Sequence, residues 1–70
     1  MIKEKIGNRI KQIRTENMKI SQEELAQMLN CDRAYISRVE SGKQNITIEN
    51  LENICQALHV TIREFFEEIV

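Results

Sequence analysis

The chain has 70 residues, of which 41% are hydrophobic and 30% charged, with two glycines and no proline. This length allows one small domain, and the composition is that of a folded globule rather than a disordered chain. Scarce glycine and absent proline favour helices with short connections over a sheet. No apolar run reaches the ~20 residues of a membrane span, and no signal-peptide pattern opens the chain, so we expect a cytoplasmic protein.

The charge is unevenly distributed along the chain. The formal net charge is −1, with +4 on residues 1–20, −1 on residues 21–45 and −4 on residues 46–70. A nearly neutral total argues at first against a nucleic-acid partner. A positive front and a negative rear, however, can orient a small domain on DNA, so DNA remains a candidate partner.

Five helices are expected, and capping residues mark where several of them begin. The first helix spans about residues 2–16, where isoleucines recur along one face. The second begins after Ser21, because Ser21 and Glu24 form a capping box in which each side chain satisfies a free backbone amide. Thr61 and Glu64 repeat this pattern at the start of the fifth helix. The apolar positions of that last helix are Ile62, Phe65, Phe66, Ile69 and Val70.

The third helix is predicted between Asp32, a favourable N-cap, and Gly42, a left-handed C-terminal stop. The fourth begins after Thr47. A tight turn separates the second and third helices, and Asn30 is expected to take the left-handed conformation there, which Asn tolerates best after Gly. The two helices must pack closely, and at Ala26 a larger side chain would collide. The residues at the packing positions are Leu25, Ala26, Leu29, Cys31, Ile36 and Val39.

The segment of residues 22–41 therefore has the pattern of a helix-turn-helix, whose second helix is built to enter the major groove of DNA. Several further motifs occur in order along nearly the whole chain: IKQIR from Ile10, SQEELA from Ser21, ISRVESGK from Ile36, and the closing Leu51, Ala57, Leu58, Val60, Phe65 and Phe66. With these motifs the chain resembles the Cro/repressor-type, or XRE-like, helix-turn-helix family.

Within that family, DRAYIS from Asp32 and GKQN from Gly42 are similar to the controller proteins of restriction-modification systems. The chain departs from the commonest family pattern at Asn30, where Gly is usual, and at Cys31, where Val or Ile is usual. The resemblance implies one all-α, five-helix, lambda-repressor-like domain over residues 1–70. It also implies a homodimer that binds an inverted-repeat operator. The absence of a sensory domain suggests autoregulation through the dimerisation equilibrium.

Base contacts are expected from the start of the recognition helix. Arg33 is the leading candidate, because a guanidinium can donate two hydrogen bonds to guanine O6 and N7. Ala34 offers a surface suited to a thymine methyl group. Ser37 and Arg38, one turn further along, can reach bases or the flanking backbone. The alternative for Arg33 is a phosphate contact or an ion pair with Asp32.

The DNA backbone is the predicted partner of five other residues. Gln22 lies at the start of the second helix, whose amides and dipole favour a phosphate, and the resemblance implies the same role. Lys43, Gln44 and Asn45 form a polar loop after the recognition helix, and the similarity to controller proteins implies that Gln44 can also reach a groove. Tyr35 either presents its hydroxyl group to a phosphate or simply packs.

The basic residues of the first helix are weaker candidates for DNA contacts. Arg9, Lys11 and Arg14 lie on its charged surface, which in most proteins is only solvated. Glu40, by contrast, is not expected to touch DNA. Its predicted partner is a basic residue such as Arg14, and the pair would hold the first helix against the recognition helix.

The end of the chain carries more apolar bulk than one face of a terminal helix easily buries. Such an excess predicts a partner surface, and two operator half-sites suit a two-fold homodimer. The alternative is that these residues close the core of the monomer. The dimerisation region is placed at about residues 47–70, with Ile62, Phe65, Phe66 and Ile69 as the interface.

No enzyme, cofactor or metal is expected. The single histidine, His59, has no evident nucleophile or metal-ligand partners. Cys31 and Cys55 lack the C-x-x-C spacing of a zinc or redox site and are interpreted as reduced, partly buried thiols, with a disulfide or a regulatory thiol as the alternative. The alternative function is that of an antitoxin or phage-type repressor that acts partly as a protein-interaction module. RNA polymerase is a further possible partner, through acidic residues near the recognition helix.

Overall fold

The computed structural model describes residues 1–69, so Val70, an expected apolar position of the last helix, lies outside the described residues. In the described part of the chain all regular structure is helical, which confirms the all-α prediction. Five α-helices and one π-helical segment follow one another. Their bounds are α1 Ile2–Gln12, η1 Ile13–Met18, α2 Gln22–Met28, α3 Arg33–Glu40, α4 Ile48–Ala57 and α5 Ile62–Glu67.

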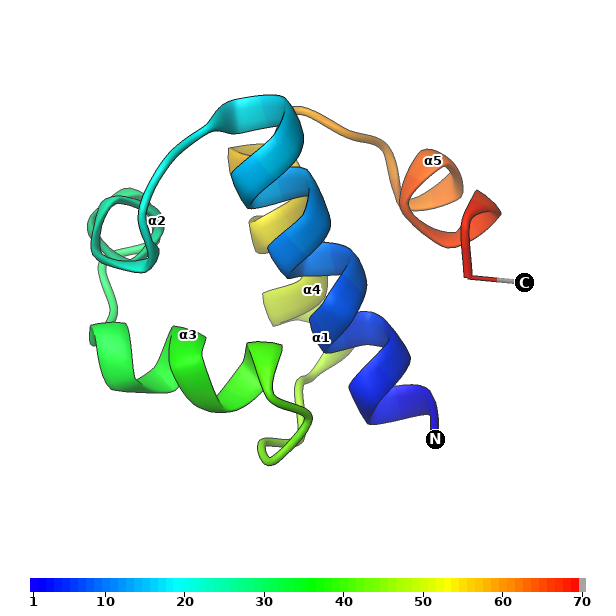
Figure 1. Ribbon diagram of the computed structural model, residues 1–70, viewed down its shortest axis with the longest axis horizontal. Helices are drawn as coiled ribbons and strands as arrows, with labels where there is room; N and C mark the ends of the chain where they lie inside the picture. Colours follow the sequence, from blue (N-terminus) through cyan, green and yellow to red (C-terminus); the bar gives the residue numbers. More distant parts are fainter. Residues whose placement is uncertain (70) are drawn as a thin grey trace.

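The helices are arranged around α1, which runs through the middle of the molecule in front of α4 (Figure 1). The helix-turn-helix pair, α2 and α3, lies on one side of α1, and α5 lies on the other side (Figure 1). We call α1 to α3 the recognition unit and α4 with α5 the C-terminal unit. The positive charge of residues 1–20 thus lies mainly on α1 and η1, and the negative charge of residues 46–70 lies mainly on the C-terminal unit.

One hydrophobic core joins the two units. The turn between α2 and α3 is tight because Ala26, only 2% exposed, lies where the two helices meet, as predicted. Leu29 and Cys31 pack against the core while partly exposed. The buried hydrophobic side chains are Ile10, Ile13, Leu25, Ala26, Ile36, Val39, Leu51, Ile54, Cys55, Leu58 and Phe65.

Both predicted capping boxes are present. The hydroxyl group of Ser21 accepts a hydrogen bond from the backbone N–H of Glu24 (3.0 Å), and the Glu24 carboxylate accepts one from the Ser21 N–H (2.8 Å). Thr61 and Glu64 make the same pair of bonds at the start of α5, at 3.0 and 2.8 Å. The bonds from Thr61 lower the pKa of the Glu64 carboxyl group, because they stabilise its charged form. Local sequence alone determined these two helix starts.

The backbone turns left-handed at the two predicted positions, Asn30 (φ 55°) and Gly42 (φ 78°). Lys19 (φ 56°) and His59 (φ 62°) do the same, which the sequence did not indicate. Asp32 occupies the N-cap position of α3 as expected, but its side chain makes no capping hydrogen bond. The predicted start of α3 is therefore correct, but the side chain of Asp32 does not form the hydrogen bond that usually stabilises such a helix start.

The first helix differs from its prediction at its C-terminal end. Instead of one α-helix over residues 2–16, the α-helix ends at Gln12 and the wider turns of η1 continue to Met18. The chain leaving η1 is tied back to Arg14, whose carbonyl oxygen accepts from the N–H of Ile20 (3.1 Å). The Arg14 guanidinium in turn donates to the Ile20 carbonyl oxygen (2.7 Å). These bonds set the direction in which the chain enters α2.

Gly7 allows α1 and α3 to approach each other closely. A Cβ atom at this position would lie 2.5 Å from the Glu40 carbonyl oxygen and closer still to that of Val39. Both of these atoms belong to the backbone, so neither can move aside without displacing α3. The role of Gly7 was not predicted, because an isolated glycine in a helical pattern does not reveal which backbone crosses it.

Candidate nucleic-acid interface

The four predicted base-reading residues share the outer surface of α3. Arg33, Ala34, Ser37 and Arg38 are all exposed, whereas the opposite side of α3 is buried in the core. Positions four residues apart lie on one side of a helix, which explains why these side chains project together. The structure thus brings the candidates onto one surface, and their contacts with bases stay predictions.

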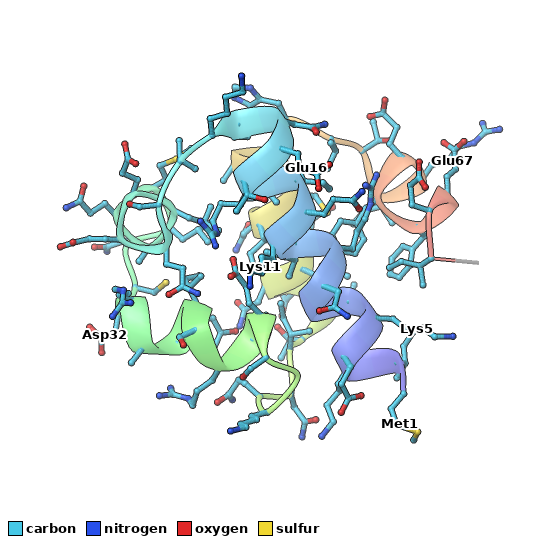
Figure 2. The ribbon with its side chains drawn as sticks, in the orientation of Figure 1. Met1, Lys5, Lys11, Glu16, Asp32 and Glu67 are labelled. Carbon is cyan, nitrogen blue, oxygen red and sulfur yellow. The ribbon has the colours of Figure 1, made fainter. Side chains whose placement is uncertain are left out.

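The side chain of Arg33 is not committed to the ion pair considered for it. Within residues 1–69 the ion pairs join Arg14 to Glu40 and the N-terminal ammonium to Glu4, and Asp32 forms none with Arg33. Asp32 instead points away from the molecule at the start of α3, on the side opposite Glu67 of α5 (Figure 2). The guanidinium of Arg33 is therefore left for bases or phosphates.

The loop that follows α3 is connected to the recognition helix by a side-chain bond. The Arg38 Nε atom donates to the Gln44 Oε1 atom (3.1 Å), and the Lys43 N–H donates to the Arg38 carbonyl oxygen (2.9 Å). Lys43 and Asn45 are exposed, and Gln44 is half-buried. Gln44 therefore orients Arg38, and the two predicted DNA contacts of this region are coupled.

A buried ion pair holds α3 against η1. Two bonds join the Arg14 guanidinium to the Glu40 carboxylate, from Nε to Oε2 (2.6 Å) and from Nη2 to Oε1 (3.1 Å). The two side chains are 8% and 3% exposed. The predicted pairing is thus confirmed, and its burial excludes Arg14 from a DNA contact in this conformation. Planar two-point pairing also restricts the orientation of both partners.

Gln22 is attached to the same ion pair. Its Nε2 atom donates to Glu40 Oε1 at 3.0 Å, which links α2 to α3 and η1 through one carboxylate. A side-chain amide carries two N–H donors, so the second one is left for a phosphate oxygen. The contact of Gln22 with the DNA backbone stays a prediction. The hydrogen bond to Glu40 already orients the side-chain amide that would donate to a phosphate.

The basic residues of α1 diverge in the structure. Lys11 is exposed and borders a groove between α1 and the helix-turn-helix, which Gln22 and Ser37 also line; Figure 2 shows it in front of α1. Arg9 points to the C-terminal unit instead, where it donates to the carbonyl oxygens of Phe65 (3.0 Å) and Glu64 (3.1 Å). Lys11 therefore joins the candidate DNA surface, and Arg9 caps α5.

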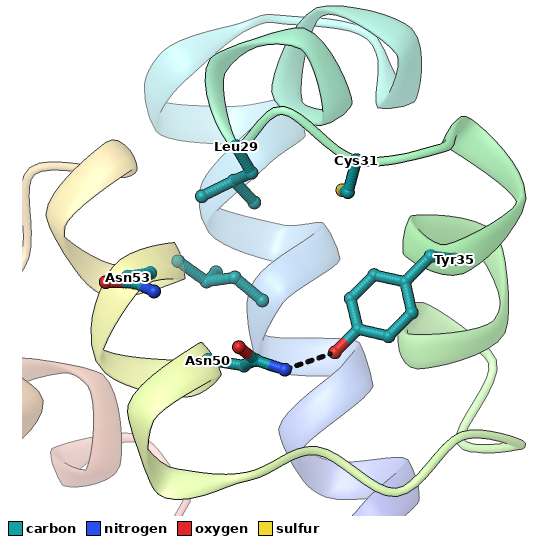
Figure 3. A pocket seen from close by; sticks show the side chains of 6 residues that line it. Leu29, Cys31, Tyr35, Asn50 and Asn53 are labelled. Carbon is teal, nitrogen blue, oxygen red and sulfur yellow. Dashed lines mark hydrogen bonds between the residues drawn. The ribbon is translucent and has the colours of Figure 1, made fainter.

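Tyr35 packs against the core, and its contact with a phosphate stays a prediction. Its ring is half-buried beside a pocket of about 210 Å³, and its hydroxyl oxygen accepts a hydrogen bond from Asn50 Nδ2 at 3.2 Å (Figure 3). The thiol of Cys31 lines the same pocket, and burial together with the Asp32 carboxylate raises the pKa of that thiol. The residues lining the pocket are Leu29, Cys31, Tyr35, Asn50, Asn53 and Ile54.

The predicted dimer interface needs one correction, at Phe65. This ring is completely buried in the core, with the Phe66 ring edge-on to it at 5.2 Å, so Phe65 has no surface to offer a partner. It faces inward because it lies on the side of α5 that closes the monomer core. Ile62 is 38% exposed, and Phe66 and Ile69 are half-buried. The interface prediction is thereby confined to these three residues.

Other kinds of site find no support among residues 1–69. No three His, Cys, Asp or Glu side chains lie close enough together to share a metal ion. Both cysteines are free thiols, as predicted. In the same range of residues, no helix combines the length and the apolar character that crossing a membrane requires.

Known proteins resemble this chain over nearly its full length. Residues 10–65 match the family described as helix-turn-helix. The control protein C.MunI from Mycoplasma sp is 41% identical over 68 residues, which cover 97% of this chain and 92% of that protein. The control protein C.BamHI from Bacillus amyloliquefaciens is 36% identical over 61 residues, covering 87% of this chain and 75% of that protein.

A solved structure shows the same similarity in three dimensions. The restriction-modification controller protein C.Esp1396I, solved as a tetramer in complex with its natural 35-base-pair operator, superposes with a TM-score of 0.88 at 40% identity. The match covers 99% of this chain and 90% of that one. The chain therefore belongs to the XRE-type helix-turn-helix family, whose members are DNA-binding transcription regulators and not enzymes.

Proposed function

We propose that this protein is a sequence-specific transcription regulator that binds an inverted-repeat operator as a homodimer and regulates its own promoter. The observation that carries the proposal is the exposed surface of α3, where Arg33 forms no ion pair within residues 1–69 and the pair of Arg14 and Glu40 holds the buried side of the helix. The similarity to restriction-modification control proteins supports the same role. A regulator of this kind acts on DNA in the cytoplasm.

In the proposed complex α3 enters the major groove. Arg33 donates to a guanine, while Lys11, Lys43 and Asn45 lie beside the flanking phosphates. The two recognition helices of a dimer then reach half-sites about 10 base pairs apart, or a multiple of that distance. RNA polymerase is a proposed partner at the promoter, through exposed acidic residues near α3.

Selection of bound duplexes from a randomised DNA library tests this function directly. At about 0.15 M salt, phosphate attraction alone is weakened, so enrichment requires base readout. We expect a two-fold symmetric motif to be enriched. A folded protein that enriches no motif contradicts the proposal and favours a protein-interaction module, as in the antitoxin alternative.

The role of Arg33 follows from measuring one variant on two kinds of DNA. Arg33→Ala is expected to cost about 1–3 kcal/mol on the selected operator and to relax the preference at one base pair. Arg63→Ala, an exposed arginine of α5, is the matched control and should leave base preference unchanged. Equal losses on operator and random duplexes would show that Arg33 only holds a phosphate.

The dimer is tested at the surface of α5. Phe66→Ala and Ile69→Asp are expected to weaken self-association and, with it, operator affinity, because they remove apolar area or place a charge in the contact. Met28→Ala removes an exposed apolar residue (51% exposed) from the other side of the molecule and serves as the control. An unchanged dimer in both α5 variants, measured by sedimentation, would exclude this interface.

A further inference from the structure

We propose that Asn50 is a positioning residue for a contact between Tyr35 and a DNA phosphate. By donating to the phenolic oxygen, it leaves the phenolic proton to point outward as a donor. The inference rests on the proposed function, since it requires that α3 lies on DNA. It assigns a role in DNA binding to α4, a helix of the C-terminal unit in which no DNA contact was predicted.

The geometry joins two helices far apart in the sequence. Tyr35 belongs to the first turn of α3, and Asn50 belongs to the first turn of α4. The Asn50 Nδ2 atom lies 3.2 Å from the Tyr35 hydroxyl oxygen (Figure 3), and the tyrosine ring lines a pocket that Leu29 and Ile54 also line. The half-buried ring of Tyr35 packs against the core, so its hydroxyl group is the polar part of the side chain that can bind a ligand.

The chemistry of the two groups decides the direction of the remaining proton. An amide nitrogen of Asn can only donate, so the Tyr35 oxygen is the acceptor of this bond. A tyrosine hydroxyl group carries one proton, and that proton is therefore not used in the bond with Asn50. Phosphate diester oxygens only accept hydrogen bonds, so a phenolic donor held with its proton outward matches them.

Asn50 is itself held in place. Its backbone N–H donates to the hydroxyl group of Thr47 at 3.0 Å, the N-cap bond that starts α4. The carboxamide therefore extends from a capped helix end rather than from a loop. A donor whose own position is restrained loses less conformational entropy when it restrains a second group.

Operator affinity in a double-mutant cycle tests the inference. Tyr35→Phe should weaken binding about tenfold or more, because it removes a hydrogen bond to a charged acceptor. Asn50→Ala should weaken it about three- to tenfold by releasing the hydroxyl group. In the Tyr35→Phe background, Asn50→Ala should have no further effect, since there is then no proton to orient.

Asn53→Ala is the matched control. It removes the same carboxamide from the same helix and from the lining of the same pocket, and within residues 1–69 no hydrogen bond joins it to Tyr35. We expect its operator affinity to stay within about twofold of the wild type. Thermal stability should be alike for the Asn50 and Asn53 variants, because both side chains are exposed.

Three outcomes would overturn the inference. Equal losses from Asn50→Ala in the wild-type and Tyr35→Phe backgrounds would mean that Asn50 contacts DNA itself. No loss from Asn50→Ala would mean that its bond is structural only. Wild-type affinity in Tyr35→Phe would remove the phosphate contact, yet operator binding by the wild type would still stand, so the proposed function would survive. Absence of operator binding by the wild type would instead refute the proposed function.

Discussion

Different kinds of contact hold the helix-turn-helix pair and the C-terminal unit to the first helical segment, which consists of α1 and η1. In the recognition unit, the buried pair of Arg14 and Glu40, with Gln22 bonded to it, joins three helices through directional bonds between side chains. In the C-terminal unit, apolar side chains pack around Phe65, and Arg9 bonds to backbone carbonyl oxygens of α5.

This difference follows from what each surface presents. The proposed DNA surface depends on individual polar groups at defined positions, and two-point hydrogen bonding restricts orientation in a way that apolar packing does not. The proposed dimer surface depends on apolar area, for which packing is sufficient. We therefore expect substitutions in the recognition unit to lower operator affinity by more than the accompanying loss of folding stability explains.

The largest effect is expected from Glu40→Ala, which leaves the Arg14 charge buried without its partner. The free energy of unfolding should fall by about 3–5 kcal/mol, measured by urea denaturation. Glu52→Ala removes an exposed carboxylate of the C-terminal unit and should cost under about 0.5 kcal/mol. A loss below about 1 kcal/mol for Glu40→Ala would show that the pair acts like a surface ion pair, and the contrast between the units would disappear.

A second variant separates stability from orientation. Replacing the pair together, with Arg14→Met and Glu40→Leu, should recover much of the lost stability, since apolar replacements of buried pairs are often neutral. Operator affinity should not recover to the same extent, because Gln22 then lacks its acceptor.

Gly7→Ala is expected to have the next largest effect. The added Cβ atom would meet backbone oxygen atoms of Val39 and Glu40, so α3 must shift away from α1, at a cost of about 3 kcal/mol. Asn8→Ala, at the next and exposed position, should be nearly neutral. Unchanged thermal stability and operator affinity in Gly7→Ala would show that the contact between α1 and α3 is adaptable.

Arg9→Met tests how the C-terminal unit is attached. Loss of its charged hydrogen bonds to the Phe65 and Glu64 carbonyl oxygens should lower the free energy of unfolding by about 1.5 kcal/mol. The affinity of the dimeric protein for operator DNA should fall only as far as dimerisation falls, which sedimentation measures separately. A loss of affinity in a variant whose dimer is intact would place Arg9 on the DNA surface after all.

The smallest effect concerns the two thiols, one in each unit. Burial raises the pKa of both thiol groups, so at neutral pH both are protonated and poorly nucleophilic. Cys31 is half-buried at the pocket, whereas Cys55 is 2% exposed. Alkylation followed by mass spectrometry should modify Cys31 first, faster as the pH rises, and Cys55 only when the chain unfolds. Equal rates would show that the C-terminal unit opens as readily as the pocket.

The sequence by itself determined the features that depend on a few neighbouring residues. The capping boxes at Ser21 and Thr61, the left-handed turns at Asn30 and Gly42, and the small residue at Ala26 were all predicted correctly. Each of these is a local event: a side chain meets its own helix end, or a residue type tolerates one backbone conformation. The motifs that indicated the family are local in the same sense.

Only the tertiary structure decided which neighbour covers each helix face. Periodicity placed Phe65 on an apolar stripe but could not tell that the core takes its ring while Ile62 remains at the surface. Nor could it tell that Arg9 turns toward α5, or that Asn50 reaches Tyr35. The physical reason is that the spacing of apolar residues along a helix shows only on which side of the helix axis a side chain lies. The contact it makes depends on helices whose crossing is set elsewhere in the chain.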